Sequence, residues 1–200
     1  MALIQNLDLV TAIIAGGKSS RFSKSKSQEY LNGKRLIEYA IALAEKISEE
    51  KILIANEDQY FSNKIFPVLS DIVSNCGPVG GIYTALVQIN KGWIATIPCD
   101  LPFLIPEVYK VLWRYRHSKK PTVAVVDQKI ESLVALWPFC LKTNVNRFIM
   151  SGSFKINQIL ANLNCIEVDM ENELEHFSKT YFFNINFPHD LKNAEKLFLK

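Results

Sequence analysis

The 200-residue sequence has no long apolar run, and this absence limits where the protein works. No stretch approaches the ~20 consecutive apolar residues that a membrane-spanning helix needs. Residues 1–9 have neither a basic start nor an apolar core, so no secretory signal peptide is visible. We therefore expect a cytoplasmic protein without a membrane partner.

Cysteine and histidine are scarce and scattered. Cys76, Cys99, Cys140 and Cys165 are far apart and form no C-x-x-C pair. This spacing is typical of reduced thiols in a cytosolic protein, and it does not indicate a structural zinc site. The three histidines have no serine or cysteine nucleophile motif beside them, so the sequence excludes acyl transfer by a catalytic triad.

Net charge is also small. A formal charge of +3 does not indicate a nucleic-acid partner, because such proteins usually carry a strongly basic surface. Apolar residues make up 48% of the chain and charged residues 22%, which is the profile of an ordinary globular protein. A chain of this length buries most of its apolar surface as one domain, so we predict a single domain over residues 1–200.

The apolar pattern predicts strands that alternate with helices. Such a rhythm is typical of an α/β fold, in which helices cover both faces of a parallel sheet. Right-handed crossovers bring the carboxyl ends of the strands to one edge of the sheet, where ligands bind. The predicted strands are 10–14, 51–55, 66–69, 93–98 and 122–126, and the predicted helices are 36–47, 79–89, 105–117 and 190–199.

The first strand ends in a loop whose residues suit a phosphate chain. Gly16 and Gly17 let the backbone turn tightly and bring N–H groups up to a ligand. Several serines and five cations follow, and amide donors, hydroxyls and positive charge at a strand end favour a polyphosphate. The alternative is an ordinary Gly-Gly turn followed by a solvated basic loop. The cations are Lys18, Arg21, Lys24, Lys26 and Lys34.

A second glycine-rich segment begins the helix at 79–89. Gly77-Pro78 breaks the chain and places a proline near the first helical position. Gly80 and Gly81 inside the helix cost about 1 kcal/mol each relative to alanine, so a ligand or close packing should compensate for them. A helix start at the strand ends would offer N–H groups to a nucleotide. Tight helix–sheet packing alone is the alternative.

A third segment places an acid at the end of a buried strand. Asp100 follows the strand 93–98 within Pro98-x-Asp100-x-Pro102. A carboxylate at this edge of a sheet suits Mg²⁺, which takes one or two carboxylates together with phosphate oxygens and water. Many aspartates at strand ends only cap the next helix, which is the alternative for Asp100.

The residues after the first strand form a longer pattern, which reads Ala15-Gly16-Gly17-x-Ser19-x-Arg21-Phe22, then Lys26, then Leu31-x-Gly33-Lys34. This pattern resembles the signature loop of the Rossmann-like nucleotidyltransferases. Within that superfamily the chain is most similar to the molybdenum cofactor guanylyltransferases, from about residue 11 to its end. The resemblance implies a Rossmann-like three-layer αβα fold with a mostly parallel sheet. Ser23 and Ser25 stand where the family has glycine and aspartate.

The resemblance implies a reaction and a nucleotide site in residues 10–105. The family transfers GMP from GTP to the terminal phosphate of molybdopterin and releases pyrophosphate, with Mg²⁺ as the cofactor. It assigns the triphosphate to Lys26 and Arg21 and the metal to Asp100, and these three residues are the expected catalytic set. The expected nucleotide-binding residues are Ile14, Ala15, Gly16, Gly17, Lys26, Asn56, Asp71 and Asp100.

The second half, residues 106–200, should supply the acceptor site. Residues 183–191 are close to the family pattern Asn-x-Asn-x-Pro-x-Asp-Leu, and alternation along a strand would place Asn184 and Asn186 on one face. Lys155 stands where the family has arginine, which keeps the charge and loses the bidentate fork. Glu131-Ser132 replaces a family pair of His or Gln followed by Pro. The expected acceptor-binding residues are Gly81, Lys155, Asn184 and Asn186, and molybdoenzymes or their chaperones are expected partners.

Two other interpretations remain open. Lys26-x-Gln28-x-Tyr30-Leu31 is similar to the cytidylyltransferases of isoprenoid synthesis, so CTP is an alternative donor, with molybdopterin or a sugar-like phosphate as the acceptor. Gly77-Pro78 and Asn184-x-Asn186 favour the molybdopterin branch. The departures at Ser23, Ser25, Ser132 and Lys155 also suit a divergent homologue that binds a nucleotide with little or no catalysis.

Overall fold

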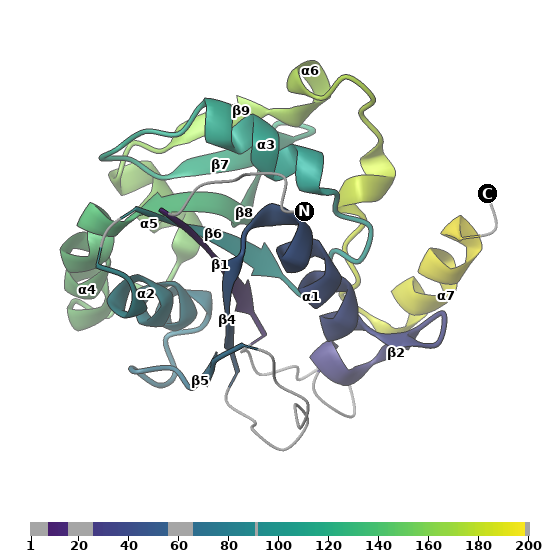
Figure 1. The fold of residues 1–200 in the computed structure, drawn as a ribbon, viewed down its shortest axis with the longest axis horizontal. Coiled ribbons are helices and arrows are strands. Elements are labelled where there is room, and N and C mark those ends of the chain that lie inside the picture. Colours follow the sequence, from purple (N-terminus) through teal and green to yellow (C-terminus); the bar gives the residue numbers. More distant parts are fainter. Residues whose placement is uncertain (1–7, 16–25, 56–65, 91, 199–200) are drawn as a thin grey trace.

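A seven-stranded sheet forms the centre of the computed structural model, which describes residues 8–15, 26–55, 66–90 and 92–198 (Figure 1). The strand order is β5-β4-β1-β6-β8-β7-β9. All of these strands run in one direction except β8, so the predicted mostly parallel sheet is confirmed. The strands are β1 (Leu9–Ile14), β4 (Glu50–Ile54), β5 (Val68–Leu69), β6 (Trp93–Pro98), β7 (Thr122–Val126), β8 (Lys129–Pro138) and β9 (Ile166–Asp169).

The central strands end at the same level of the sheet. In the parallel register Ile14 lies beside Ile54 on one side and beside Pro98 on the other. The ladder continues for one more residue, because the Ala15 N–H donates to the Ile54 carbonyl at 2.9 Å. The carboxyl ends of β1, β4 and β6 therefore lie together at the edge of the sheet where α/β folds bind ligands.

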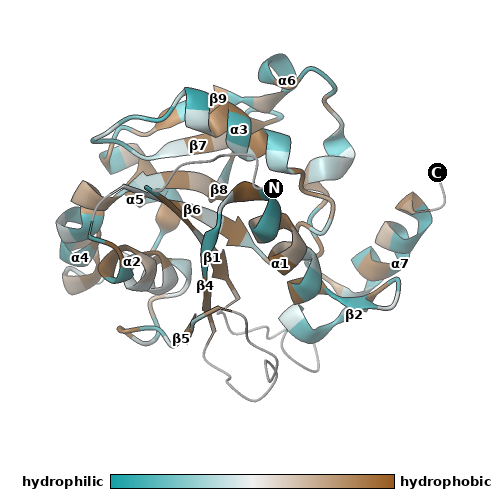
Figure 2. Cartoon of the chain, in the orientation of Figure 1, coloured by the Kyte–Doolittle hydropathy of each residue, from teal (hydrophilic) through white to brown (hydrophobic). Residues whose placement is uncertain are grey.

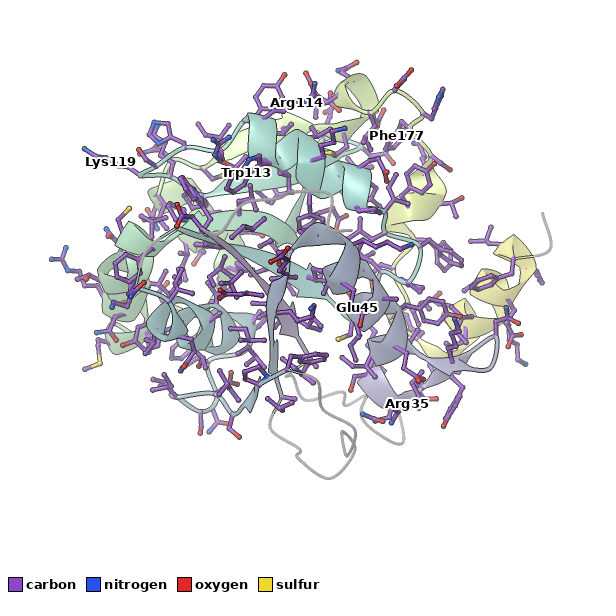
Figure 3. The ribbon with its side chains drawn as sticks, in the orientation of Figure 1. Arg35, Glu45, Trp113, Arg114, Lys119 and Phe177 are labelled. Atoms are coloured by element: carbon purple, nitrogen blue, oxygen red, sulfur yellow. The ribbon has the colours of Figure 1, made fainter. Side chains whose placement is uncertain are left out.

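Helices cover both faces of the sheet, as the sequence predicts. The apolar sides of α1 (Leu36–Ile47) and α3 (Pro106–Arg114) pack on one face, and those of α2 (Pro78–Gln88), α4 (Lys142–Met150) and α5 (Ile156–Asn162) pack on the other. The helices accordingly show apolar and polar sides in Figure 2. On α3, for example, Val108 and Leu112 are buried, while Arg114 extends outward (Figure 3).

The antiparallel strand β8 contains an irregularity next to its neighbour β7. The two strands form a hairpin whose turn residues, Asp127 and Gln128, both have positive φ, as a two-residue hairpin turn requires. Val123 lies opposite Ala135, yet the next residue of β7 lies opposite Glu131, so residues 132–134 of β8 bulge out of the ladder. Such bulges re-aim side chains next to functional sites.

The carboxyl-terminal segment returns to the edge where β6 ends. It contains α6 (Met170–Glu173), the short 3-10 turn η4 (Lys179–Phe182) and α7 (Pro188–Leu197). The Ile185 N–H donates to the Asp100 carbonyl at 2.9 Å, which fixes this segment to the end of β6. A small apolar cluster of Leu31, Leu36, Ile185 and Ala194 joins α7 to the hairpin of β2 (Tyr30–Leu31) and β3 (Lys34–Arg35) (Figure 1).

Several element bounds differ from the prediction. The third helix ends at Arg114 rather than 117, because Tyr115 leaves the helical conformation with ψ near 1°. The last helix begins at Pro188, two residues earlier than predicted, and β5 starts at Val68 rather than 66. Residues 129–138 form a long strand that the predicted elements do not include. Strands from both halves of the chain join the one sheet.

Two short turns complete the described elements. The 3-10 turn η1 (Lys26–Gln28) precedes β2, and η3 (Phe139–Leu141) links β8 to α4. Among the described residues, no helix combines the length and the apolar character that crossing a membrane requires.

Candidate nucleotide and acceptor site

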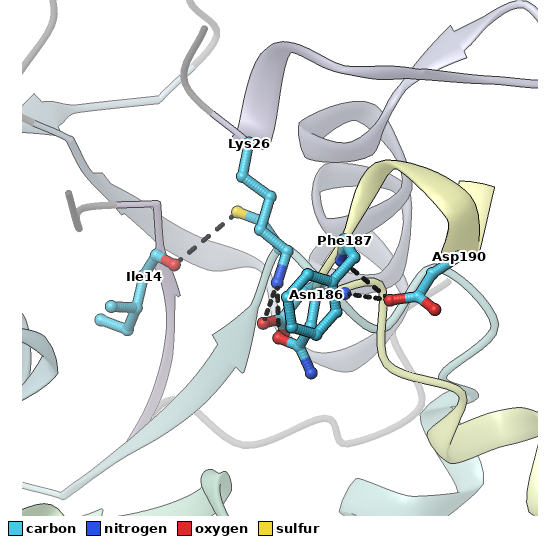
Figure 4. A network of polar contacts seen from close by, with 7 residues as sticks. Ile14, Lys26, Asn186, Phe187 and Asp190 are labelled. Atoms are coloured by element: carbon cyan, nitrogen blue, oxygen red, sulfur yellow. Dashed lines mark hydrogen bonds and ion pairs between the residues drawn. The ribbon is translucent and has the colours of Figure 1, made fainter. Parts of the chain in front are cut away.

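Lys26 lies between two oxygen-bearing side chains from distant parts of the sequence. Its Nζ donates to Asp100 Oδ2 at 2.8 Å and to Asn186 Oδ1 at 3.1 Å (Figure 4). The side chains of Lys26 and Asp100 are 18% and 26% exposed, so the ion pair is partly shielded from water. The structure thus joins the predicted phosphate-binding lysine, the predicted metal-binding acid and a predicted acceptor residue in one cluster.

Asp100 is placed by the end of β6. The strand stops at Pro98, and the Asp100 backbone carbonyl accepts a hydrogen bond from Ile185. The preceding residue, Cys99, is buried, and its Sγ lies 3.7 Å from the carbonyl of Ile14 on the neighbouring strand. Burial, followed by the charge of Asp100, raises the pKa of the Cys99 thiol, so this cysteine is not a nucleophile at neutral pH.

Asn186 is held by the start of α7. Asp190 Oδ2 accepts the backbone N–H groups of both Asn186 and Phe187, each at 2.8 Å. A carboxylate three residues into a helix that binds the N-cap N–H is half of a capping box. The predicted strand through Asn184 and Asn186 is wrong, because residues 183–186 lie outside the sheet and Ile185 bonds to Asp100 instead. The alternation survives, since Asn184 and Asn186 are exposed and Ile185 is buried.

Lys26 is positioned by the turn η1 and the hairpin that follows it. The Lys26 carbonyl accepts the Glu29 N–H at 3.1 Å, and the Glu29 carbonyl accepts the Leu36 N–H at 2.9 Å. Ser27 is buried beneath this turn. The backbone at Lys26 is therefore tied to the start of α1, and its side chain reaches across to Asp100.

Glu131 brings a second carboxylate toward Asp100. It is half-buried on β8, the strand next to β6, just beyond the bulge at residues 132–134. Burial and then the negative charge of Asp100 raise the pKa of the Glu131 carboxyl. In the sequence, Glu131 stands out only as a departure from the family pattern. Its place on the strand beside β6 is the signal that reveals its proximity to the site.

Other predicted nucleotide-binding residues lie along the same sheet edge. Asp71 follows β5, and the loop that contains it is tied to α2 because the Ile72 N–H donates to Thr84 Oγ1 at 2.9 Å. The Ala15 N–H bonds to Ile54, so any contact of Ala15 with a nucleotide would use its carbonyl. The Ile14 carbonyl faces the Cys99 thiol. Arg21, Gly16, Gly17 and Asn56 lie outside the described residues.

The remaining acceptor predictions are not joined to this cluster by any described contact. Gly81 is buried in α2, where an added Cβ would lie 3.3 Å from the Ile14 side chain and 3.5 Å from that of Ile54. This close approach explains the glycine by helix–sheet packing. Lys155 is exposed at the start of α5, and Asn184 is exposed before α7. Their roles as acceptor ligands stay predictions.

The cluster offers oxygen ligands of the kind that Mg²⁺ prefers. Asp100 supplies a carboxylate and Asn186 an amide oxygen, and both oxygens already bind a cation, the ammonium of Lys26. Among the described residues, no group of three or more His, Cys, Asp or Glu side chains could hold a metal ion. The donor set therefore fits a cation that takes its other ligands from phosphate and water.

Residues 11–165 match the family described as the MobA-like NTP transferase domain. The chain belongs to this family. Its curated relatives include a probable molybdenum cofactor guanylyltransferase of Halalkalibacterium halodurans, 28% identical over 94% of this chain and 98% of the relative. A molybdenum cofactor guanylyltransferase of Yersinia pestis is also 28% identical, over 92% of this chain and 93% of that one.

Solved structures extend the likeness to the fold. A molybdopterin-guanine dinucleotide biosynthesis protein A from Archaeoglobus fulgidus is 26% identical and superposes with a TM-score of 0.81 over 95% of this chain and 98% of that chain. A 4-diphosphocytidyl-2C-methyl-D-erythritol synthase from Anaerococcus prevotii is 12% identical with a TM-score of 0.67 over 96% of this chain and 98% of that one. The second likeness shows the shared fold alone. The predicted nucleotidyltransferase fold is confirmed.

Proposed function

We propose that this protein transfers GMP from GTP to the terminal phosphate of molybdopterin, with Mg²⁺ as the cofactor. The observation that carries the proposal is the likeness over nearly the full chain to relatives named molybdenum cofactor guanylyltransferase. The cluster of Lys26, Asp100 and Asn186 supports it, because it places a cation and oxygen ligands at the edge of the sheet where nucleotides bind.

The reaction exchanges one phosphoanhydride bond for another. An oxygen of the acceptor phosphate attacks the α-phosphorus of GTP, and a new P–O bond forms. The bond between the α-phosphorus and the bridging oxygen to the β-phosphate breaks, and pyrophosphate leaves with its electron pair. The attacking phosphate is already an anion, so the protein needs no strong general base. Its task is to align two anions and to stabilise the negative charge of the transition state.

The described residues suit this task. Lys26 sits on a turn tied to α1, which fixes the backbone from which its ammonium would contact the phosphates. Asp100 and Asn186 would hold the divalent cation, which supplies charge neutralisation on the phosphates when bound. The carboxylate of Asp100 repels phosphate unless a cation lies between them, so its place here favours a cation-dependent site.

The acceptor would lie on the side of this cluster formed by the carboxyl-terminal half. Asn186 is fixed there by Asp190, and Asn184 is exposed two residues before it. The family resemblance is the basis for assigning further residues to the two sites. The acceptor site then includes Lys155 and Gly81, and the nucleotide site includes Arg21, Gly16, Gly17, Asn56 and Asp71. Delivery of the product to molybdoenzymes or their chaperones belongs to the same proposal.

The test combines ligand binding with turnover. GTP with Mg²⁺ should raise the melting temperature more than CTP, UTP or ATP. A ligand present at 100 times its dissociation constant adds about 2.7 kcal/mol to the free energy of unfolding. Incubation with GTP, Mg²⁺ and molybdopterin should then yield the guanine dinucleotide and pyrophosphate. A larger shift with CTP would replace the proposal by a cytidylyltransferase. Nucleotide binding without pyrophosphate release would identify a non-catalytic homologue.

A further inference from the structure

The ammonium of Lys26 occupies the oxygens that a divalent cation would use. It contacts Asp100 Oδ2 at 2.8 Å and Asn186 Oδ1 at 3.1 Å, which are ordinary distances for charge-assisted and neutral-acceptor hydrogen bonds. In Figure 4 dashed lines join the side-chain nitrogen of Lys26 to the two oxygens. A cation that binds Asp100 Oδ2 and Asn186 Oδ1 directly would have to take the place of this ammonium.

The surroundings of this position carry negative charge and are partly shielded from water. Asp100 is 26% exposed, and Glu131 on the neighbouring strand adds a second, half-buried carboxylate on the side of β8. The nearby Asp190 carboxylate is already engaged, because it accepts two backbone N–H groups and lies 3.2 Å from His189 Nε2. Ammonium and metal would use the same two oxygens, and like charges a few ångströms apart in a partly shielded site repel, so the two cations compete for this position.

We propose that Lys26 is a placeholder for the divalent cation: its ammonium neutralises Asp100 until the nucleotide arrives, and then moves to the phosphates as the metal takes its oxygens. The proposal rests on the proposed function in taking a nucleotide with a divalent cation as the ligand. It goes beyond that function by assigning an order of events. The cation alone binds poorly, and cation and nucleotide enter together.

The linkage follows from the two alternative partners of one charge. Phosphate oxygens attract the ammonium away from Asp100, which exposes the carboxylate to the metal. Because thermodynamic coupling is reciprocal, whatever draws Lys26 away from Asp100 must strengthen metal binding, and the metal must strengthen binding of the phosphates. A lysine that served the phosphates from a position away from Asp100 would have little effect on the affinity of the metal in the absence of nucleotide.

The test measures Mn²⁺ binding without nucleotide, by electron paramagnetic resonance of the free ion. Wild-type protein should bind Mn²⁺ weakly, and Lys26→Met should bind it at least ~10-fold more tightly, since removing a cation at this distance removes a large repulsion. The matched control is Lys179→Met, which removes a lysine paired with Asp127 and changes the net charge equally. Its side chain is 68% exposed, and we expect less than a ~2-fold change.

A double variant shows whether the added Mn²⁺ affinity comes from Asp100. The gain in Lys26→Met should disappear when Asp100→Asn is added, since the double variant lacks the carboxylate that the metal gains. Lys26→Gln replaces Lys26→Met if the latter does not fold, because glutamine removes the charge and keeps a hydrogen-bonding group. Unchanged Mn²⁺ affinity in both Lys26 variants overturns the proposal, and so does a gain that persists without Asp100.

A failure of this inference is distinguishable from a failure of the proposed function. If GTP with Mg²⁺ stabilises the wild-type protein and pyrophosphate is released, the function stands whatever the Mn²⁺ titrations give. If the Lys26 variants bind Mn²⁺ more tightly through Asp100 and no nucleotide raises the melting temperature, the lysine is a placeholder in a cation site and the proposed function is wrong.

Discussion

The two ends of strand β6 each carry a cation, and the two cations are held in different ways. At the amino end the guanidinium of Arg116 lies 4.2 Å from the ring centroid of Trp113 and 5.6 Å from that of Trp93, the first residue of the strand. Its Nη1 donates to the Trp113 carbonyl at 2.8 Å. At the carboxyl end the ammonium of Lys26 bonds to the side chains of Asp100 and Asn186.

The two cations differ in whether a metal ion could bind in their place. Ring faces and a carbonyl at the end of a helix suit a planar guanidinium. The two tryptophans also pack edge to face, with their ring centroids 5.3 Å apart. That arrangement packs the surface and offers no ligand set for a metal. A carboxylate and an amide oxygen accept any hard cation. The first cation is therefore part of the fold, and the second is part of the site.

We expect the largest effect on turnover from replacing Asp100, at the carboxyl end of β6. Asp100→Asn keeps the size and the backbone bond to Ile185, so the melting temperature should change little. We expect at least a ~1000-fold fall in kcat, because the site loses the charge that holds the metal at the phosphates. Turnover assays across a Mg²⁺ titration check this. Turnover at the wild-type rate would exclude Asp100 as the metal ligand.

Removing Lys26 should have the next largest effect on turnover. Lys26→Ala should lower kcat at least ~100-fold, because an oriented cation at developing charge typically contributes several kcal/mol. Stability should change much less than activity, since the ion pair is partly exposed and its loss leaves Asp100 some access to water. Parallel measurements of kcat and thermal unfolding separate the two. Equal losses of stability and activity would make Lys26 a structural residue like Arg116.

Many of the strands and helices could be predicted because their signals are local. The apolar runs at 93–98 and 122–126 and the helical spacing at 36–47 give the observed bounds, and Asp100 follows directly from the end of its strand. The long strand β8 could not be placed in the same way. Its bulge depends on pairing with two neighbours at once, and this pairing is what carries Glu131 toward Asp100.

The central cluster itself required tertiary structure. Lys26 and Asn186 are 160 residues apart in sequence, and tertiary contacts such as the Ile185–Asp100 bond and the apolar cluster of Leu31 and Ile185 bring them together. The contact that fixes the backbone next to Asn186 could be predicted from the sequence. Asp190 stands three residues after Phe187 at the start of a helix, which is the spacing of a capping box. The alternation of Asn184 and Asn186 predicts a strand, whereas residues 183–186 form a loop in the structure.

At the amino end of β6 the expected effect is on stability alone. Arg116→Ala should lower the free energy of unfolding by about 1 kcal/mol, the scale of an exposed cation–π contact with one hydrogen bond, and the melting temperature by about 2–4 °C. The exposed Arg147 on α4 provides a control, and its replacement by alanine should stay within ~0.5 kcal/mol. Kinetic constants should be unchanged in both. A fall in kcat for Arg116→Ala would break the comparison between the two ends.

We expect the smallest effect at a second lysine–aspartate pair. This pair tests whether greater exposure to water makes an ion pair less important than that of Lys26 and Asp100. Lys179 Nζ donates to Asp127 Oδ1 at the tip of the β7–β8 hairpin, where both side chains are more than half exposed. This hydrogen bond lowers the pKa of Asp127 and raises the pKa of Lys179. Water screens such pairs, so Asp127→Asn should shift the melting temperature at neutral pH by less than ~1 °C and leave turnover unchanged.

The pH dependence of that small shift follows from the two directions. A lowered carboxyl pKa stabilises the fold fully above the ordinary aspartate value of 3.8 and loses this contribution as the pH falls through the lowered pKa. A raised lysine pKa stabilises the fold fully below the ordinary value of 10.5 and loses this contribution as the pH rises through the raised pKa. The difference in melting temperature between wild type and Asp127→Asn should therefore be constant between about pH 5 and 9 and shrink on both sides. A large and pH-independent difference would show that Asp127 acts through the backbone of the hairpin, where its N–H bonds to Glu171, and not through its charge.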